Sequence, residues 1–279
     1  MGFFGGKMGL GFFLTDLRNG FDFFLRERLS FSRKGYSESG LDLDRELSLM
    51  RLGDAQLTED LVERYRFAPY LAHLSKQSFL DNIVHLMLLD SLAKYVAIFP
   101  DGKVLDVGSK NFAYCVAIYE FLRARYRAHN SFPADEALCE VWGVEIDVHR
   151  RYSNLHTRRS CAEYYSRLIP GAKFIQGDIL HAKLSGPFRL ITHFYPFVEL
   201  YSLLDFGLPS RYYKPLEIFR RIFQMLEPGG QYILANTTKD EYLHSRSLLE
   251  ACQFCHVGSG SVCNGLTNNK PIYASIYYK

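Results

Sequence analysis

Three acidic side chains end short apolar runs, where they could bind hydrogen-bond donors of a ligand. Asp106 lies in VLDVG, Glu145 in WGVEID and Asp178 at the end of FIQGD. Because an ionised carboxylate only accepts hydrogen bonds, each of them is suited to a hydroxyl or an amine. Asp147, two residues after Glu145, is a fourth candidate. The pattern indicates a polar ligand bound by acids from separate segments.

These acids also have purely structural interpretations. Asp106 could be a buried acid that binds the amides of the following loop. Asp178 could cap a helix or a turn. Asp147 could stand at a helix start, where the helix dipole stabilises an acid. Residue types alone leave both interpretations open.

The stretch GSKNFAY, after Asp106, is a candidate ligand-binding turn. Gly108 permits a backbone conformation that is strained for other residues. Ser109, Lys110 and Asn111 then stand where such turns often carry more glycine. Lys110 either blocks the pocket or turns aside, and in the second case its ammonium could pair with an anionic ligand group at the start of the next helix.

A further set of reactive side chains follows the run FRLITHF. His193 is the best candidate for a general base, because the unperturbed pKa of histidine is near neutrality. A core histidine is the alternative. Glu199 is the second candidate base, and Tyr195 is a candidate substrate contact.

The elements that must position these residues alternate in type after Pro100. The apolar runs KVLDV, EVWGVEI, AKFIQGD, FRLITHF and QYILAN are separated by helical patterns that begin near residues 111, 149, 211 and 240. This alternation predicts parallel strands joined by crossover helices, with ligands beyond the carboxyl ends of the strands. The runs FCHVGSGSV and PIYASIYYK are separated only by a polar loop, which predicts a terminal antiparallel pair.

The first part of the chain has a different hydrophobic pattern, which is helical. Residues 9–99 show helical periodicity, with one helix predicted to begin at Thr58, and residues 32–47 are predicted to be a mobile connection. We therefore predict a helical cap or substrate region over 1–99 and a ligand-binding domain over 100–279. The aromatic segment 1–25 carries too many charges for a membrane span, and it either packs on the main domain or makes weak membrane contact.

The order of these motifs resembles the class I methyltransferases that bind S-adenosylmethionine. The resemblance spans Lys103 to Lys279 and rests on VLDVG, WGVEID, FIQGD and the turn LEPGGQYIL, in that order. It implies an α/β, Rossmann-like seven-stranded sheet, with five parallel strands, a C-terminal antiparallel hairpin and an N-terminal helical cap. It also implies that Glu145 binds the ribose and Asp178 the adenine amine, while Asp106 lies near the methionine end of the cofactor. The residues implied in cofactor binding are Asp106, Gly108, Ser109, Lys110, Asn111, Glu145, Asp147 and Asp178.

The resemblance implies an S-adenosylmethionine-dependent methyltransferase that acts on a small, apolar or aromatic molecule. Two alternatives stay open. The first is a catalytically inactive relative that serves as a binding or interaction protein, because Lys110 closes the loop. The second is a membrane-peripheral methyltransferase that acts on lipid.

Other functions are less well supported by the sequence. GSKNFA lacks two glycines of the dinucleotide-binding pattern, and the DFG at Asp205 has no other kinase motif around it. The net charge of +3 gives no strong nucleic-acid signal. We predict no metal site, because Cys252, Cys255, His256 and Cys263 lack a second well-spaced ligand pair. Six cysteines, mostly inside predicted elements, favour a reduced, cytoplasmic protein.

Overall fold

Seven strands form one mixed sheet in the computed structural model, which describes residues 9–29, 31–97, 102–128 and 139–279. The strand order is β3-β2-β1-β4-β5-β7-β6. Neighbours from β3 to β5 are parallel, and β7 pairs antiparallel with both β5 and β6. The strands are β1 Lys103–Val107, β2 Glu140–Glu145, β3 Lys173–Gln176, β4 Phe188–Phe194, β5 Leu226–Asn236, β6 Cys255–Val262 and β7 Ile272–Tyr278. The predicted Rossmann-like sheet and its terminal antiparallel pair are confirmed.

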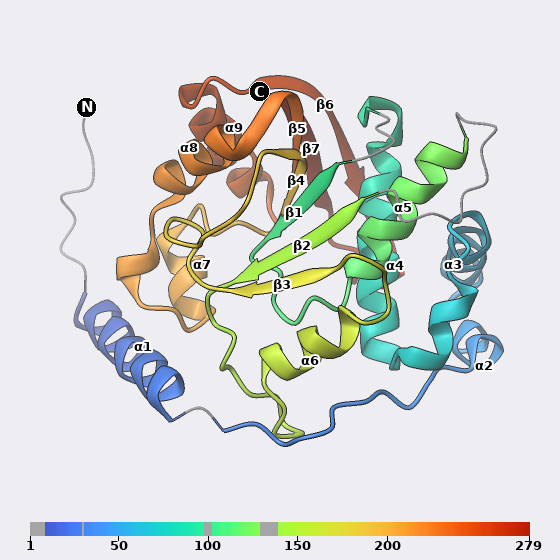
Figure 1. The fold of residues 1–279 in the computed structure, drawn as a ribbon, viewed down its shortest axis with the longest axis horizontal. Helices are drawn as coiled ribbons and strands as arrows, with labels where there is room; N and C mark the ends of the chain where they lie inside the picture. The colour runs from blue at the N-terminus through green and yellow to red at the C-terminus, as the bar shows by residue number, and fades with distance from the viewer. Residues whose placement is uncertain (1–8, 30, 98–101, 129–138) are drawn as a thin grey trace.

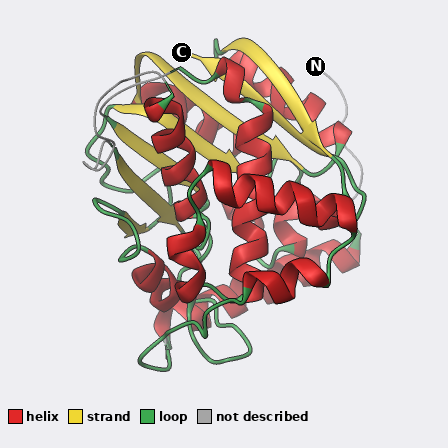
Figure 2. Ribbon diagram, turned by 90° about the vertical axis from the view of Figure 1, so that its right-hand side faces the viewer, coloured by secondary structure: helices red, strands yellow, loops and turns green. Residues whose placement is uncertain are grey.

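Helices cover both faces of this sheet, because side chains alternate between the faces along each strand. Leu105 packs on the face covered by α8 (Pro215–Met225) and α9 (Lys239–Ala251), whereas Val104 packs on the face covered by α4 (Lys76–Ser91) and α5 (Cys115–Arg127). Figure 1 shows these pairs on opposite sides of the strands, and Figure 2 shows the helices of the second face in front of the sheet. Between strands the chain also forms α6 (Arg158–Tyr165) and α7 (Leu200–Asp205).

The helices before the sheet share its core instead of forming a core of their own. They are α2 (Leu43–Ser48), α3 (Leu52–Arg64) and α4, with 3-10 turns at Ala68–His73 and Ala93–Tyr95. Gly258 in β6 lets Tyr95 approach, because a Cβ there would lie 2.5 Å from the Tyr95 ring. In the described part of the predicted cap, α3 and α4 thus belong to the layer on the sheet. Helix α1 (Leu10–Arg28) lies instead beside the carboxyl ends of the strands, against α7. Among the described residues, no helix is long and apolar enough to cross a membrane.

Residues 32–47, predicted to be a mobile connection, are bonded to the domain at several points up to α2, and we call residues 31–42 the strap. The Arg33 amide donates to the Leu155 carbonyl at 3.1 Å, and the Leu41 amide donates to the Leu71 carbonyl at 2.8 Å. Between these points the Tyr36 ring packs edge-on against Tyr164 and its hydroxyl donates to Glu38 at 2.5 Å. The strap runs from α1 below the sheet to α2 (Figure 1).

Candidate functional site

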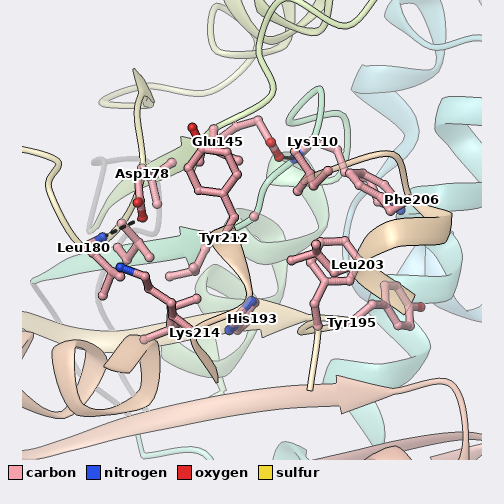
Figure 3. A pocket seen from close by; sticks show the side chains of 18 of the residues that line it. Lys110, Glu145, Asp178, Leu180, His193, Tyr195, Leu203, Phe206, Tyr212 and Lys214 are labelled. Atoms are coloured by element: carbon pink, nitrogen blue, oxygen red, sulfur yellow. Dashed lines mark hydrogen bonds between the residues drawn. The ribbon is translucent and has the colours of Figure 1, made fainter. Parts of the chain in front are cut away.

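A cavity of about 380 Å³ lies beyond the carboxyl ends of the parallel strands. Figure 3 shows Glu145 and Asp178 on one side of it and His193 and Tyr195 on the other. The turn after β1 contributes Gly108 and Lys110 to the lining. The structure therefore brings together these predicted residues, which come from four different strand ends: Gly108, Lys110, Glu145, Asp178, His193 and Tyr195.

The turn after β1 keeps a left-handed backbone at three positions, although only one of them is glycine. The φ angles are 69° at Gly108, 50° at Lys110 and 59° at Phe112. The amide of Gly108 donates to the Val144 carbonyl at 2.9 Å, which ties the turn to β2. Side chains at positive φ are strained, so packing must hold the other two residues in place.

Gly143 in β2 supplies the space for that packing. A Cβ at Gly143 would lie 2.7 Å from the fully buried Phe112 ring and 2.8 Å from the Ser109 hydroxyl oxygen. Ser109 is itself buried, so its side chain supports the turn and does not line the cavity. Asn111 has a similar role, because its side-chain oxygen accepts from the Ala113 amide at 3.3 Å.

We expect Gly143→Ala to destabilise the protein by about 1–3 kcal/mol, the usual cost of overpacking a filled core. Urea unfolding monitored by circular dichroism measures this change. Gly53→Ala is the matched control, because a Cβ at that helical position meets nothing within 4 Å. An unfolding midpoint for Gly143→Ala equal to that of the control would contradict the packing described here.

Glu145 is nearly buried, with 4% of its surface exposed, and it organises the backbone around the cavity. One carboxylate oxygen accepts from the Lys110 amide at 2.8 Å and the other from the Asp147 amide at 2.7 Å. Arg158 adds a positive charge 3.6 Å away. A carboxylate has about four lone-pair sites, so acceptor capacity remains after the two amide bonds.

Asp147, predicted to bind the cofactor, is instead fully buried at the centre of an arginine cluster. Its carboxylate lies 3.1 Å from Arg26 of α1, 2.7 Å from Arg150 and 3.8 Å from Arg158. The guanidinium carbons of Arg150 and Arg158 each lie 4.7 Å from the centre of the Phe206 ring, which lines the cavity. Asp147 does not line the cavity, and its cluster supports the wall and fixes α1.

Asp106 also lies behind the lining. It is fully buried, and one of its oxygens accepts from the Thr192 hydroxyl at 2.8 Å. Burial raises the pKa of Asp106 to about 7, and the hydrogen bonds from Thr192 and Tyr114 oppose this shift. Asp106 is therefore a buried acid, as the structural interpretation expected, but its described partner is Thr192 of β4 and not an amide of the loop.

Between the usual value of 3.8 and about 7, folded Asp106 keeps a proton that the unfolded chain releases. This residue's contribution to the free energy of unfolding should therefore fall as pH rises through that window and become constant above it. Asp106→Asn cannot titrate, so its stability relative to the wild type should rise with pH. Urea titrations from pH 4 to 8 measure this, with exposed Asp60→Asn as control; a stability difference independent of pH would contradict the burial effect.

His193 lines the cavity but lacks the pKa expected of a base at neutral pH. It is 9% exposed, and its Nδ1 lies 3.1 Å from the Tyr232 hydroxyl. Burial lowers the pKa of His193 to about 3, so the ring stays neutral and weakly basic. This shift does not favour the predicted role of His193 as general base, which stays a prediction.

Of the other two candidates after β4, Tyr195 lines the cavity and Glu199 does not. Tyr195 lines the cavity, with a left-handed φ of 63° fixed by its amide, which donates to the Ala235 carbonyl at 2.8 Å. Glu199 is not part of the lining and instead pairs with His244 Nδ1 at 2.7 Å.

The Lys110 side chain lines the cavity wall and leaves its volume open. Its ammonium lies 5.6 Å from the centre of the Tyr195 ring. Lys110 is exposed as a whole residue, whereas nearby protein atoms desolvate its ammonium. This desolvation lowers the pKa of Lys110, and the nearby Asp81 carboxylate opposes the shift. Lys110 is thus a cation at the edge of the cavity, turned toward Tyr195.

The remaining wall comes from the segment between β4 and α8. Of this segment and the end of β4, only His193, Tyr195 and Glu199 were predicted to contribute to the site. Lining residues that were not predicted include Leu203, Phe206, Leu208, Tyr212 and Lys214 of this segment and Ile218 of α8. Tyr212 and Lys214 lie between α7 and α8, where the chain folds back over the carboxyl ends of the strands.

A second cavity of about 420 Å³ adjoins the first. The two share Tyr195, Phe197, Phe206 and Thr237. The second is also lined by Tyr201 and by Glu241, whose carboxylate accepts from the Ser202 hydroxyl at 3.0 Å. Within the described part of the chain, no group of three or more His, Cys, Asp or Glu side chains could hold a metal ion.

No protein-family model matches the chain, and no curated protein matches it in sequence. Similar solved structures include a methyltransferase from Pyrococcus furiosus (16% identity, 71% of this chain, 82% of that chain, TM-score 0.46). A second is the N-methyltransferase NodS from Bradyrhizobium japonicum WM9 (13% identity, 72% of this chain, 96% of that chain, TM-score 0.45). A third is a SAM-dependent methyltransferase from Aquifex aeolicus (11% identity, 70% of this chain, 91% of that chain, TM-score 0.47). At these identities and TM-scores the likeness assigns no activity to this chain.

Proposed function

We propose that this protein is an S-adenosylmethionine-dependent methyltransferase that acts on a small molecule. The observation that carries this proposal is the cavity beyond the strand ends, where the Gly108 turn, Glu145 and Asp178 meet. In an open parallel sheet this edge is the usual position of a nucleotide-like ligand. The motif order VLDVG, WGVEID, FIQGD and LEPGG, which resembles the methyltransferase family, supports the same ligand.

The residues present fit this cofactor. The cavity volume of about 380 Å³ lies in the range of small-molecule pockets, roughly 300–1,000 Å³. Glu145 retains acceptor capacity for the two ribose hydroxyls. Asp178 accepts from the Leu180 amide at 3.0 Å and keeps its second oxygen for the adenine amine. Lys110 is the cation for the methionine carboxylate, and Gly108 permits close approach of the backbone.

The bound cofactor would supply an activated methyl group on a sulfonium. The chain would mainly align the acceptor and exclude water, because in-line displacement depends on orientation. Leu203 and Phe206 provide an apolar wall for this purpose. We place the acceptor in the second cavity, whose shared aromatic lining of Tyr195, Phe197 and Phe206 favours an apolar or aromatic molecule.

The low basicity of His193 bears on the choice of acceptor. With a pKa of about 3, this side chain is a poor proton acceptor at neutral pH. We therefore assign His193 to contact within the cavity. An acceptor atom whose proton His193 would have to remove is therefore a poor fit to this site.

A methyl-transfer screen tests the proposal. The protein is incubated with methyl-labelled S-adenosylmethionine and fractionated small-molecule extracts, and the label is followed by mass spectrometry. We expect transfer to a small apolar or aromatic compound. Cofactor binding without transfer to any fraction would favour the alternative, a catalytically inactive binding protein.

A further inference from the structure

Helix α1 is fixed to the domain by one face only. Asn19 donates to the carbonyls of Leu204 at 2.7 Å and Leu208 at 3.2 Å, and it is 1% exposed. Asp16 accepts from the Ser210 amide at 2.6 Å, and Arg26 pairs with Asp147. These bonds lie along the helix and set its rotation, so its opposite face cannot turn inward.

That opposite face is a continuous apolar stripe. Its residues recur at intervals of three and four, which places them on one side of a helix. Their exposed fractions range from 52% to 75%, although all have large apolar side chains. This α1 stripe consists of Leu10, Phe13, Leu14, Leu17, Phe21 and Phe24. A helix of 19 residues is about 28 Å long, and exposed Leu29 and Phe31 follow its end.

The exposed charges on α1 and in the residues just after it are mostly positive. In residues 9–29 and 31–34 the exposed cations are Arg18, Arg28, Arg33 and Lys34, and Asp22 is the exposed acid. Arg28 lies over the Phe24 ring, 5.6 Å from its centre, so an apolar surface and a cation lie side by side.

At the end of α1, a groove of about 290 Å³ is likewise lined by apolar and cationic side chains. Leu25, Leu29 and Phe31 provide its apolar side. Arg26, His149 and Arg151 provide cationic or titratable groups, and Asp22 is also part of the lining. An amphiphile with an anionic head fits both halves of this lining.

We propose that α1 is an interfacial helix that binds the surface of a bilayer containing anionic phospholipid. Interfacial helices bury a Phe- and Leu-rich face to the level of the headgroups while flanking cations meet anionic lipid, at about 1 kcal/mol per Lys or Arg. A second copy of this chain is a poorer occupant. In a two-fold pair the same surface of each copy would face the other, so cations such as Arg18 and Arg28 would add like charges to the interface, and these oppose association.

The bound surface would lie close to the candidate site. Phe23 on the inner face of α1 packs with Leu203, Leu204 and Leu208, and of these Leu203 and Leu208 line the first cavity. One layer of side chains therefore separates the helix from the cavity. The membrane proposal stands apart from the proposed methyl transfer, because vesicle binding requires no cofactor.

Vesicle flotation of the full chain tests the proposal. We expect at least tenfold more protein to float with vesicles of phosphatidylcholine and phosphatidylserine than with phosphatidylcholine alone, and high salt should reduce the difference. The triple variant Phe13→Ser, Leu17→Ser, Phe21→Ser should lose flotation at an unchanged melting temperature. Leu52→Ser with Leu243→Ser is the matched control, because these exposed leucines lie outside the α1 stripe.

Two results would overturn the proposal. One is a wild-type protein that fails to float with either kind of vesicle. The other is a triple variant that still floats but changes from dimer to monomer in light scattering, which would make the α1 stripe a contact between copies.

Discussion

Replacing Glu145 with glutamine should weaken binding of S-adenosylhomocysteine about 100-fold. The variant keeps the size of the side chain and one acceptor oxygen, but it loses the charge. Hydrogen bonds to a charged group contribute about 1.5–3 kcal/mol each, and 1.4 kcal/mol corresponds to a factor of ten. Part of the loss would come from the backbone, since the two oxygens also accept from Lys110 and Asp147.

A second ligand separates these two contributions. The 2′-deoxy analogue lacks one of the hydroxyls assigned to Glu145, so wild-type protein should bind it more weakly than the parent compound. Glu145→Gln should discriminate less between the two ligands, because the coupled partner is already weakened. Calorimetry on four pairings of protein and ligand gives the coupling energy. Equal discrimination by both proteins would mean that Glu145 holds the loop without contacting the ribose. Glu163→Gln, on the exposed face of α6, is the control.

The second large effect concerns Lys110. If its ammonium binds the carboxylate of the cofactor, Lys110→Met should weaken S-adenosylhomocysteine binding about tenfold to 100-fold, as expected for a charge-assisted hydrogen bond. 5′-Methylthioadenosine has the same nucleoside but no amino-acid carboxylate, so its affinity should be unchanged. The comparison of the two ligands makes the assay specific for the carboxylate.

Lys110→Gly extends this test, because the φ angle of 50° suits glycine better than lysine. This variant should bind 5′-methylthioadenosine as well as the wild type does, and it should lose affinity for S-adenosylhomocysteine. Tighter binding of both ligands by Lys110→Gly would contradict our account and show that the lysine obstructs the cavity.

The sequence predicted the sheet well because its signals are local. Short apolar runs alternate with helical patterns, and this alternation predicts parallel strands and the residues at which they end. Helix starts were less accurate. The helix predicted at Thr58 begins at Leu52, because the Thr58 hydroxyl bonds the Asp54 carbonyl inside the helix instead of capping it. The helix predicted near His149 begins at Arg158, after a loop closed by the Arg151–Thr157 bridge.

Within the candidate site, residues at strand ends were predictable and residues that depend on distant contacts were not. Glu145 and Asp178 follow from the strand pattern alone. The role of Asp147 depends on Arg26, which is 121 residues away in the chain. The low pKa of His193 depends on burial, which a sequence motif does not reveal. The two faces of α1 explain why its sequence fitted both packing and membrane contact, because one face packs and the other is exposed.

Cofactor binding by the intact protein tests the central proposal most directly. Isothermal titration calorimetry with S-adenosylmethionine and S-adenosylhomocysteine should give one site per chain for each ligand. Asp178→Asn should weaken the binding of both ligands. The control Glu163→Gln should bind both ligands as tightly as the wild type does. If neither ligand binds the wild-type chain at millimolar concentration, the proposed methyltransferase activity is contradicted.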